Sequence, residues 1–125
     1  VVLVDSTEPV GVAVGLFSRS FYEILYNATT DDGVVVAQTE SPFYNADLIR
    51  SSHAALRAVF PVVRLYLAFI PTYPSGMWSF TLASKKHDPL QVATERFTPL
   101  ETRYFTPDVF RSSFALPRFV EDLLT

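Results

Sequence analysis

Two apolar runs in the chain each stop abruptly at polar side chains. Residues 1–4 (Val-Val-Leu-Val) are followed by Asp5, and residues 34–37 (Val-Val-Val-Ala) are followed by Gln38. Short continuous runs rich in β-branched residues are typical of strands that are covered on both faces of a parallel sheet. The pattern therefore predicts two buried strands, each with polar groups at its C-terminal end.

Apolar positions recur at helical spacing after each of these runs. The first helix is expected to begin after Ser18 as its N-cap and to stop at residues 31–33 (Asp-Asp-Gly). The second is expected to begin at Asn45, also a capping residue, and to end before Pro61. The predicted inner faces consist of Phe21, Ile24, Leu25 and Ala28 in the first helix and of Leu48, Ile49, Ala55, Leu56 and Val59 in the second.

Two further apolar segments, residues 62–70 and 77–84, are joined by a short turn at residues 71–76 (Pro-Thr-Tyr-Pro-Ser-Gly). Because so short a connection joins antiparallel neighbours, these segments are expected to form a hairpin. Shorter helical patches are predicted at residues 107–113 and 117–124. The order β-α-β-α-β-β predicts an α/β fold with parallel strands and a closing hairpin that adds an antiparallel edge.

Polar side chains follow three of the predicted strands. Asp5 and Glu8 follow the first strand, Gln38 and Glu40 follow the second, and Tyr73 follows the third, framed by two prolines that fix the backbone on either side. Ligands of open α/β sheets bind at the carboxyl ends of the parallel strands. A lone acid at a strand end is more often a helix cap or a loop hydrogen-bonder. Three strand ends together favour a binding site at this edge.

The composition excludes several classes of protein. The chain has 125 residues, of which 49% are hydrophobic, with a net charge of −3 and no cysteine. Its size predicts one globular domain, and its charge gives no footprint for nucleic acid. Without cysteine, the unpaired His53 and His87 give no pattern for a metal site. No apolar stretch reaches the roughly 18 residues of a membrane helix.

Residues 11–15 carry glycine at both ends without the setting of a dinucleotide fingerprint, so they are interpreted as a flexible loop.

Four longer segments carry a specific resemblance. They are residues 5–9 (Asp-Ser-Thr-Glu-Pro), 36–43 (Val-Ala-Gln-Thr-Glu-Ser-Pro-Phe), 70–81 (Ile-Pro-Thr-Tyr-Pro-Ser-Gly-Met-Trp-Ser-Phe-Thr) and 113–117 (Ser-Phe-Ala-Leu-Pro). In order and spacing they closely resemble the C-terminal half of bacterial spermidine synthases, or polyamine aminopropyltransferases. The resemblance covers essentially the whole chain and implies the C-terminal half of a methyltransferase-like Rossmann fold.

The same resemblance implies a cytoplasmic transferase of spermidine biosynthesis. Such an enzyme transfers an aminopropyl group from decarboxylated S-adenosylmethionine to putrescine and forms spermidine and methylthioadenosine. Decarboxylated S-adenosylmethionine is a co-substrate, so no cofactor and no metal are expected. The partners that the resemblance implies are these two small molecules, with neither nucleic acid nor membrane.

The resemblance also implies roles on the amine side of the site. Asp5 is similar to the catalytic acid/base that receives the proton from the attacking amine, and Tyr73 to a catalytic phenol that is hydrogen-bonded to this amine. Glu8 matches a second acid that binds the amine substrate, and Gln38 matches a substrate-contacting glutamine. Trp78 is by default a core residue, but it lies close to this polar edge and is expected to wall the amine pocket. The chemistry is consistent, because an ammonium group must lose a proton to a base before it can attack.

On the nucleoside side, Val12, Ala13 and Leu16 fall where the loop of the family packs on adenine, and Asp5 also borders the nucleoside. Phe110 departs from the family, where histidine is frequent. The glycine-rich nucleoside loop and an N-terminal β-hairpin domain are expected upstream of Val1. Residues 1–125 are therefore expected to be the C-terminal part of the catalytic domain, inactive without the N-terminal half of the polypeptide. A homodimer or homotetramer is also implied.

Two other functions stay open at this point. A methyltransferase that uses S-adenosylmethionine shares the fold, but it has no need for acids that grip a dicationic acceptor. A non-catalytic polyamine-binding fragment is the other alternative. The acceptor amine is also open, since agmatine, cadaverine and spermidine are close variants of putrescine.

Overall fold

A four-stranded sheet forms the centre of the molecule in this computed structural model, which describes residues 1–6, 10–98 and 101–125. Its strands are β1 (Val2–Val4), β2 (Val34–Gln38), β3 (Val62–Phe69) and β4 (Met77–Ser84). Each lies where the apolar runs of the sequence predict a strand. The mixed α/β fold predicted from the sequence is thereby confirmed.

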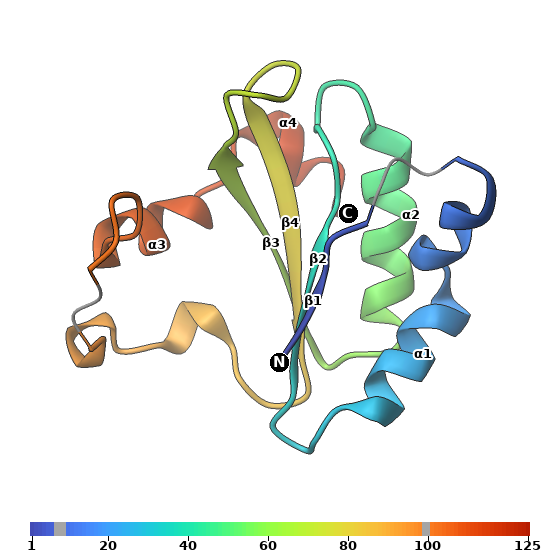
Figure 1. Cartoon of the computed structure of the whole chain (residues 1–125), viewed down its shortest axis with the longest axis horizontal. Helices are drawn as coiled ribbons and strands as arrows, with labels where there is room; N and C mark the ends of the chain where they lie inside the picture. The colour runs from blue at the N-terminus through green and yellow to red at the C-terminus, as the bar shows by residue number, and fades with distance from the viewer. Residues whose placement is uncertain (7–9, 99–100) are drawn as a thin grey trace.

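Helices cover one face of this sheet. Figure 1 shows α1 (Arg19–Ala28) and α2 (Ala46–Arg57) on that face, whereas α3 (Pro107–Ser113) lies on the opposite side. The C-terminal helix α4 (Arg118–Glu121) is a single turn. Short 3-10 helices complete the elements: η1 (Gly11–Phe17), η2 (Pro89–Gln91) and η3 (Thr94–Arg96). Within the described ranges, no helix has the length and apolar character needed to cross a membrane.

The strand order β1-β2-β4-β3 corrects one expectation. β1 pairs in parallel with β2, with Val4 opposite Ala37, and β3 and β4 form the predicted antiparallel hairpin. The antiparallel strand does not lie at the edge, because β4 also pairs with β2 and thus fills the slot between β2 and β3. The α2 crossover carries the chain past this slot, and the tight turn after β3 returns it there. Among the described residues, the edge strands of the sheet are therefore β1 and β3.

Local capping signals were right for one helix and wrong for another. The Ser18 hydroxyl accepts a hydrogen bond from the backbone N–H of Phe21 at 3.3 Å, as an N-cap should. Asn45 occupies the N-cap position of α2, but its side chain makes no capping bond. The turn before α2 is instead closed by the backbone, since the Asn45 N–H donates to the Ser41 carbonyl at 2.8 Å. The predicted loop at residues 11–15 is also wrong, because these residues begin the 3-10 helix η1.

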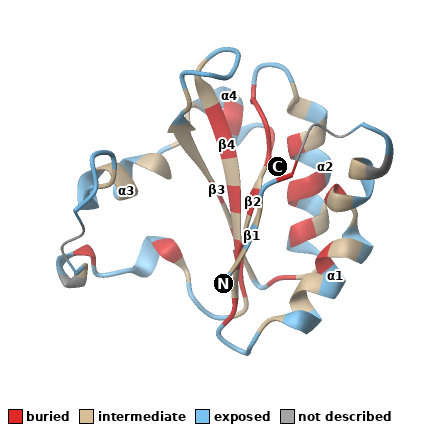
Figure 2. Cartoon of the chain, in the orientation of Figure 1, coloured by how far each residue is buried: buried red, intermediate tan, exposed pale blue. Residues whose placement is uncertain are grey.

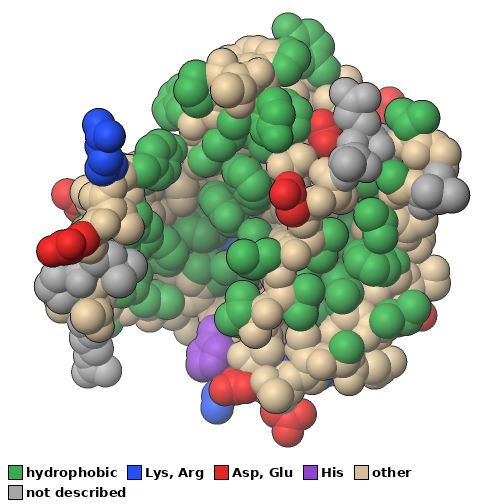
Figure 3. All heavy atoms as spheres, viewed as in Figure 1, with side chains coloured by type: hydrophobic (Ala, Val, Ile, Leu, Met, Phe, Trp, Pro, Cys, Tyr) green, Lys and Arg blue, Asp and Glu red, His purple; other side chains and the backbone are tan. Residues whose placement is uncertain are grey.

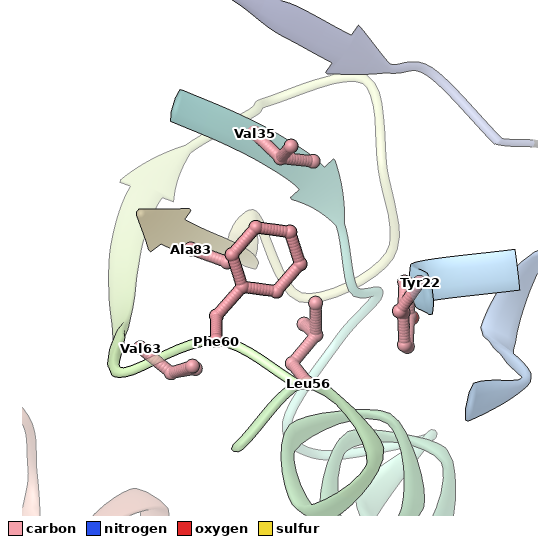
Figure 4. Packing of buried hydrophobic residues seen from close by; sticks show 6 residues of the cluster. All are labelled: Tyr22, Val35, Leu56, Phe60, Val63 and Ala83. Carbon is pink, nitrogen blue, oxygen red and sulfur yellow. The ribbon is translucent and has the colours of Figure 1, made fainter. Parts of the chain in front are cut away.

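The main apolar core lies between the sheet and its two covering helices. Figure 2 shows buried residues concentrated along the central strands and the inner side of α2. Figure 4 shows one cluster in which side chains from α1, α2 and the sheet meet: Tyr22, Val35, Leu56, Phe60, Val63 and Ala83. Burying such side chains is the main favourable term in folding, and here it fixes the sheet against α1 and α2.

The opposite face of the sheet is only partly covered. An apolar hollow of about 220 Å³ separates β3 from α3, and Figure 3 shows hydrophobic side chains gathered there. Several phenylalanines are half-buried here: Phe110 packs edge-on against Phe97 and Phe114, with centroids 5.2 and 5.4 Å away. The Tyr104 hydroxyl accepts a hydrogen bond from the Phe69 N–H at 3.3 Å and ties this segment to the end of β3.

Candidate functional site

A cleft of about 390 Å³ opens where β1 and β2 end and where the chain turns from β3 to β4. It is lined by Asp5, Ser6, Gln38, Glu40, Tyr73, Pro74 and Trp78. Of the polar groups predicted to converge from three strand ends, Asp5, Gln38, Glu40 and Tyr73 are therefore found together. The cleft contains four of the residues singled out on the amine side, namely Asp5, Gln38, Tyr73 and Trp78.

Two reciprocal hydrogen bonds hold the end of β1 against the end of β2. The Gln38 side-chain amide donates through Nε2 to the Ser6 carbonyl at 3.1 Å, and the Ser6 hydroxyl donates to the Gln38 carbonyl at 3.4 Å. Because Asp5 directly precedes Ser6, this pair fixes the backbone from which the Asp5 carboxylate extends. Ser6 was not singled out from the sequence, and a serine at a strand end carries no signal of such pairing.

Asp5 lies between two hollows. Besides lining the cleft, Asp5 and Gln38 border an adjoining hollow of about 330 Å³ on the sheet surface, with apolar walls from Val36, Tyr66 and Phe80. The rings of Tyr66 and Phe80 stack with centroids 5.3 Å apart and planes tilted by 17°. An exposed carboxylate at the boundary of a polar cleft and an apolar hollow can contact two different ligands at once.

Glu40 is the second acid that lines the cleft, and buried hydroxyl groups hold its backbone in place. Glu40 is only 3% exposed, and its φ of 72° lies in the left-handed region that glycine favours. Its carbonyl accepts bonds from both the Ser79 N–H at 2.9 Å and the Ser79 hydroxyl at 2.8 Å. The Thr39 hydroxyl in turn bonds those of Ser79 and Thr81, at 2.9 and 3.2 Å. This network over-determines the strained backbone at Glu40, as is common at binding sites.

The turn at residues 71–76 presents Tyr73 at the rim of the cleft. The Tyr73 N–H donates to the Ile70 carbonyl at 3.0 Å, and the Gly76 N–H donates to the Tyr73 carbonyl at 3.0 Å. Ser75 and Gly76 both have left-handed φ values, 69° and 68°. The Ser75 hydroxyl lies 3.2 Å from that of Ser41 and thus links this turn to the loop after β2. The prolines of this turn therefore act together with specific hydrogen bonds.

Tyr73 also packs on Trp78. The two ring centroids are 4.3 Å apart, and Trp78 is buried while Tyr73 is 40% exposed. The indole N–H of Trp78 is buried and has no hydrogen-bond partner among the described residues. A buried aromatic floor with a partly exposed phenol above it suits an elongated ligand with an apolar middle and polar ends.

Several residues named from the sequence lie elsewhere. Ala13 and Leu16 are half-buried in η1 and do not line the cleft, so their contact with adenine stays a prediction. Glu8 and the side chain of Val12 lie outside what the structure describes. Among the described residues, no group of three or more potential metal ligands comes together.

Comparison with known proteins adds an independent observation. The family model described as "Spermine/spermidine synthase domain" matches residues 1–93. The polyamine aminopropyltransferase of Caldicellulosiruptor saccharolyticus is 53% identical over 124 residues, which is 99% of this chain and 45% of the relative. The polyamine aminopropyltransferase of Desulforudis audaxviator is 56% identical over 121 residues, 97% of this chain and 44% of the relative.

Solved structures agree with these sequence matches. A crystal structure of spermidine synthase in complex with the transition state analogue AdoDATO has a TM-score of 0.89 at 43% identity, over 96% of this chain and 42% of that one. Spermidine synthase from Thermotoga maritima has a TM-score of 0.83 at 43% identity, over 89% of this chain and 39% of that one. The chain thus spans a little under half the length of the relatives it matches.

Proposed function

Because the chain belongs to the spermine/spermidine synthase family, we propose that its cleft is the amine side of an aminopropyltransferase site. The donor in this proposal is decarboxylated S-adenosylmethionine and the acceptor is putrescine. The observation that carries the proposal is the cleft itself, which brings Asp5, Gln38 and Tyr73 together from three strand ends. An acidic lining and an aromatic floor match the two ammonium groups and the methylene chain of a diamine.

In the proposed reaction, Asp5 is the base. Putrescine is a dication at neutral pH, and its attacking nitrogen becomes a nucleophile only after it loses a proton. The exposed Asp5 carboxylate accepts that proton, and the Tyr73 hydroxyl orients the nitrogen lone pair at the rim of the cleft. Gln38 holds the Asp5 backbone through its bond to the Ser6 carbonyl.

The leaving group of this reaction needs no proton, so no general acid is required. The amine nitrogen bonds to the sulfur-bound methylene carbon of the aminopropyl group while the carbon–sulfur bond breaks. The electron pair of that bond stays on sulfur, so the sulfonium leaves as the neutral thioether methylthioadenosine. The protein therefore contributes mainly orientation for in-line attack and the removal of one proton.

A second acid gives the cleft a basis for selecting diamines. Glu40 lines the same cleft as Asp5, together with the aromatic side chains of Trp78 and Tyr73. In a cleft with two acidic side chains, a diamine can place one ammonium group near each. A monoamine of equal length has one ammonium group and so makes one such charge-assisted contact in place of two. We expect putrescine to be preferred to butylamine for this reason.

The nucleoside part of the site is proposed to lie largely outside residues 1–125. The chain spans 45% of the length of its relative from C. saccharolyticus, which supports this proposal. Titration of the 125-residue chain with methylthioadenosine tests it: weak binding or none is expected, and tight binding would contradict it.

We further propose that the complete protein is a cytoplasmic homodimer or homotetramer. Sedimentation and cell fractionation test this, and a monomer or a membrane-bound protein would contradict it.

One assay tests the proposed activity. The complete protein that carries these 125 residues is incubated with decarboxylated S-adenosylmethionine and one amine at a time: putrescine, agmatine, cadaverine, spermidine or butylamine. Methylthioadenosine release is expected with putrescine and little with butylamine. Absence of release with every amine would overturn the proposal, and methyl transfer from S-adenosylmethionine would favour a methyltransferase instead.

A further inference from the structure

A second cavity lies apart from the cleft. It has a volume of about 440 Å³ and is bounded by the C-terminal turn of α2, the beginning of β3 and the C-terminal segment of the chain. Its polar lining comes from His53, Arg57 and Arg64, and its apolar lining includes Phe60, Leu65 and Phe114. None of the residues that line this cavity also lines the cleft. Its volume lies in the usual range for small-molecule pockets.

His53 is a buried polar side chain in the wall of this cavity. It projects from α2, is only 5% exposed, and its Nδ1 has no hydrogen-bond partner among the described residues. Burial, together with the positive charges of Arg57 and Arg64, lowers the pKa of His53 to about 4. At neutral pH the imidazole is therefore uncharged and has one donor and one acceptor. Buried polar groups are normally hydrogen-bonded, so an unpaired imidazole in a cavity wall points to a missing partner.

The two arginines differ in how far a neighbouring acid neutralises their charge. The Arg64 guanidinium donates to both carboxylate oxygens of Asp88, at 3.2 and 2.6 Å, so its charge is offset. Arg57 is exposed and forms no ion pair within the described ranges. A cation in the last turn of a helix is also favoured by the helix dipole, which is a structural reason for an arginine there. The helix dipole does not explain why the Nδ1 of His53 has no hydrogen-bond partner among the described residues. Because Arg64 is paired with Asp88, the charge that remains uncompensated in the cavity is about that of Arg57 alone.

We propose that this cavity binds a small monocarboxylate with an apolar body about the size of an aromatic ring. The carboxylate would pair with the planar guanidinium of Arg57, which suits two parallel hydrogen bonds, and would give the His53 imidazole a polar neighbour. Phe60, Leu65 and Phe114 would surround the apolar body. A single compensating charge favours a monoanion over a phosphate dianion, which usually binds where several donors converge.

The test uses sodium benzoate as the probe and the complete protein that carries this chain. Isothermal titration is expected to give saturable binding with a dissociation constant of about 1 mM or tighter. Benzamide, which has the same shape but no charge, is expected to bind about tenfold more weakly, because it cannot form a charge-assisted pair with Arg57. Inorganic phosphate is titrated in parallel and is expected to bind more weakly than benzoate.

Two variants on the same helix locate the site. Arg57→Gln is expected to weaken benzoate binding about tenfold. Arg50→Gln is the matched control, since Arg50 is also exposed on α2 but pairs with Asp47 outside the cavity, and binding should be unchanged. His53 is tested without substitution: its imidazole NMR signals should move as benzoate is added. The proposal is overturned if benzoate fails to saturate by about 20 mM. It is also overturned if Arg57→Gln binds normally, if phosphate binds as well as benzoate, or if the His53 signals stay fixed.

Discussion

The rings of Tyr73 and Trp78 lie with their centroids 4.3 Å apart and their planes tilted by 35°, although one belongs to a turn and the other to β4. Trp78 is only 6% exposed and anchors the more exposed Tyr73 from below. The phenol is therefore held in place by packing as well as by the proline-framed backbone. At the rim of the cleft, its hydroxyl can contact a bound ligand.

Removing that hydroxyl tests its role. Tyr73→Phe keeps the ring on Trp78 but deletes one hydrogen bond to the proposed amine, so turnover should fall by about tenfold. Steady-state methylthioadenosine release with putrescine measures the change. Tyr44→Phe, at an exposed position outside the cleft, is the control. Unchanged turnover in Tyr73→Phe would remove the phenol from the reaction.

The bond between Gln38 and Ser6 is expected to position Asp5. Gln38→Glu has almost the same shape, but its carboxylate cannot donate to the Ser6 carbonyl, which accepts from Nε2 in the native chain. We expect turnover to fall by tenfold or more, since misplacement of a catalytic group is costly. Gln91→Glu, at an exposed position in η2, makes the same charge change away from the cleft. Equal activity in both variants would contradict the positioning role.

The left-handed backbone at Gly76 predicts a stability difference between two glycines. A Cβ on either Gly76 or Gly15 would meet no atom within 4 Å, so crowding does not distinguish them. Only Gly76 has a positive φ, 68°, which costs an alanine about 1 to 2 kcal/mol. Urea unfolding should therefore show Gly76→Ala to be less stable than Gly15→Ala. Equal stability of the two variants would mean that the turn relaxes at no cost.

Buried His53 predicts acid sensitivity. Its pKa is lowered from 6.5 to about 4 by burial first, and then by the charges of Arg57 and Arg64. Below pH 6.5 the unfolded chain binds a proton at this position, whereas the folded chain does not until about pH 4. The unfolded state thus binds more protons in this window, so stability rises with pH across it. On acidification from pH 6.5 to 4 the loss should be at most about 3 kcal/mol.

Unfolding measured at several pH values separates this contribution from others. His53→Gln should flatten the dependence between pH 6.5 and 4 relative to the native chain. The exposed His87→Gln should leave the slope at its native value. If His53→Gln retains the full pH dependence, the buried imidazole is not its source.

Most helices and strands were predictable from the sequence, because residues close together in the chain determine where each element forms. The apolar runs gave all four strands, and Ser18 capped α1 as its hydroxyl allows. The position of β4 between β2 and β3 was not predictable in this way, since strand pairing depends on contacts between distant segments. Asn45 shows the same limit: a backbone bond to Ser41 took the place of the side-chain cap.

The candidate site was predictable to a similar extent. That Asp5, Gln38 and Tyr73 would meet followed from the common edge of the strands. The sequence carried no signal for the bond between Gln38 and Ser6 or for the hydroxyl pair of Ser41 and Ser75. Both join segments more than 30 residues apart, through side chains common in any loop. Such pairs become visible only once the backbone brings the loops together.

In the reaction that we propose, Asp5 takes the proton from the attacking amine. The most direct measurement compares methylthioadenosine release by the complete native protein and its Asp5→Asn variant, with putrescine and decarboxylated S-adenosylmethionine. Asparagine keeps the shape but cannot accept the proton, so turnover should fall by about two to four orders of magnitude, with nucleoside affinity changed far less. Asp31→Asn, in the exposed turn before β2, is the control and should be fully active. Turnover of Asp5→Asn equal to that of the native protein would contradict the account.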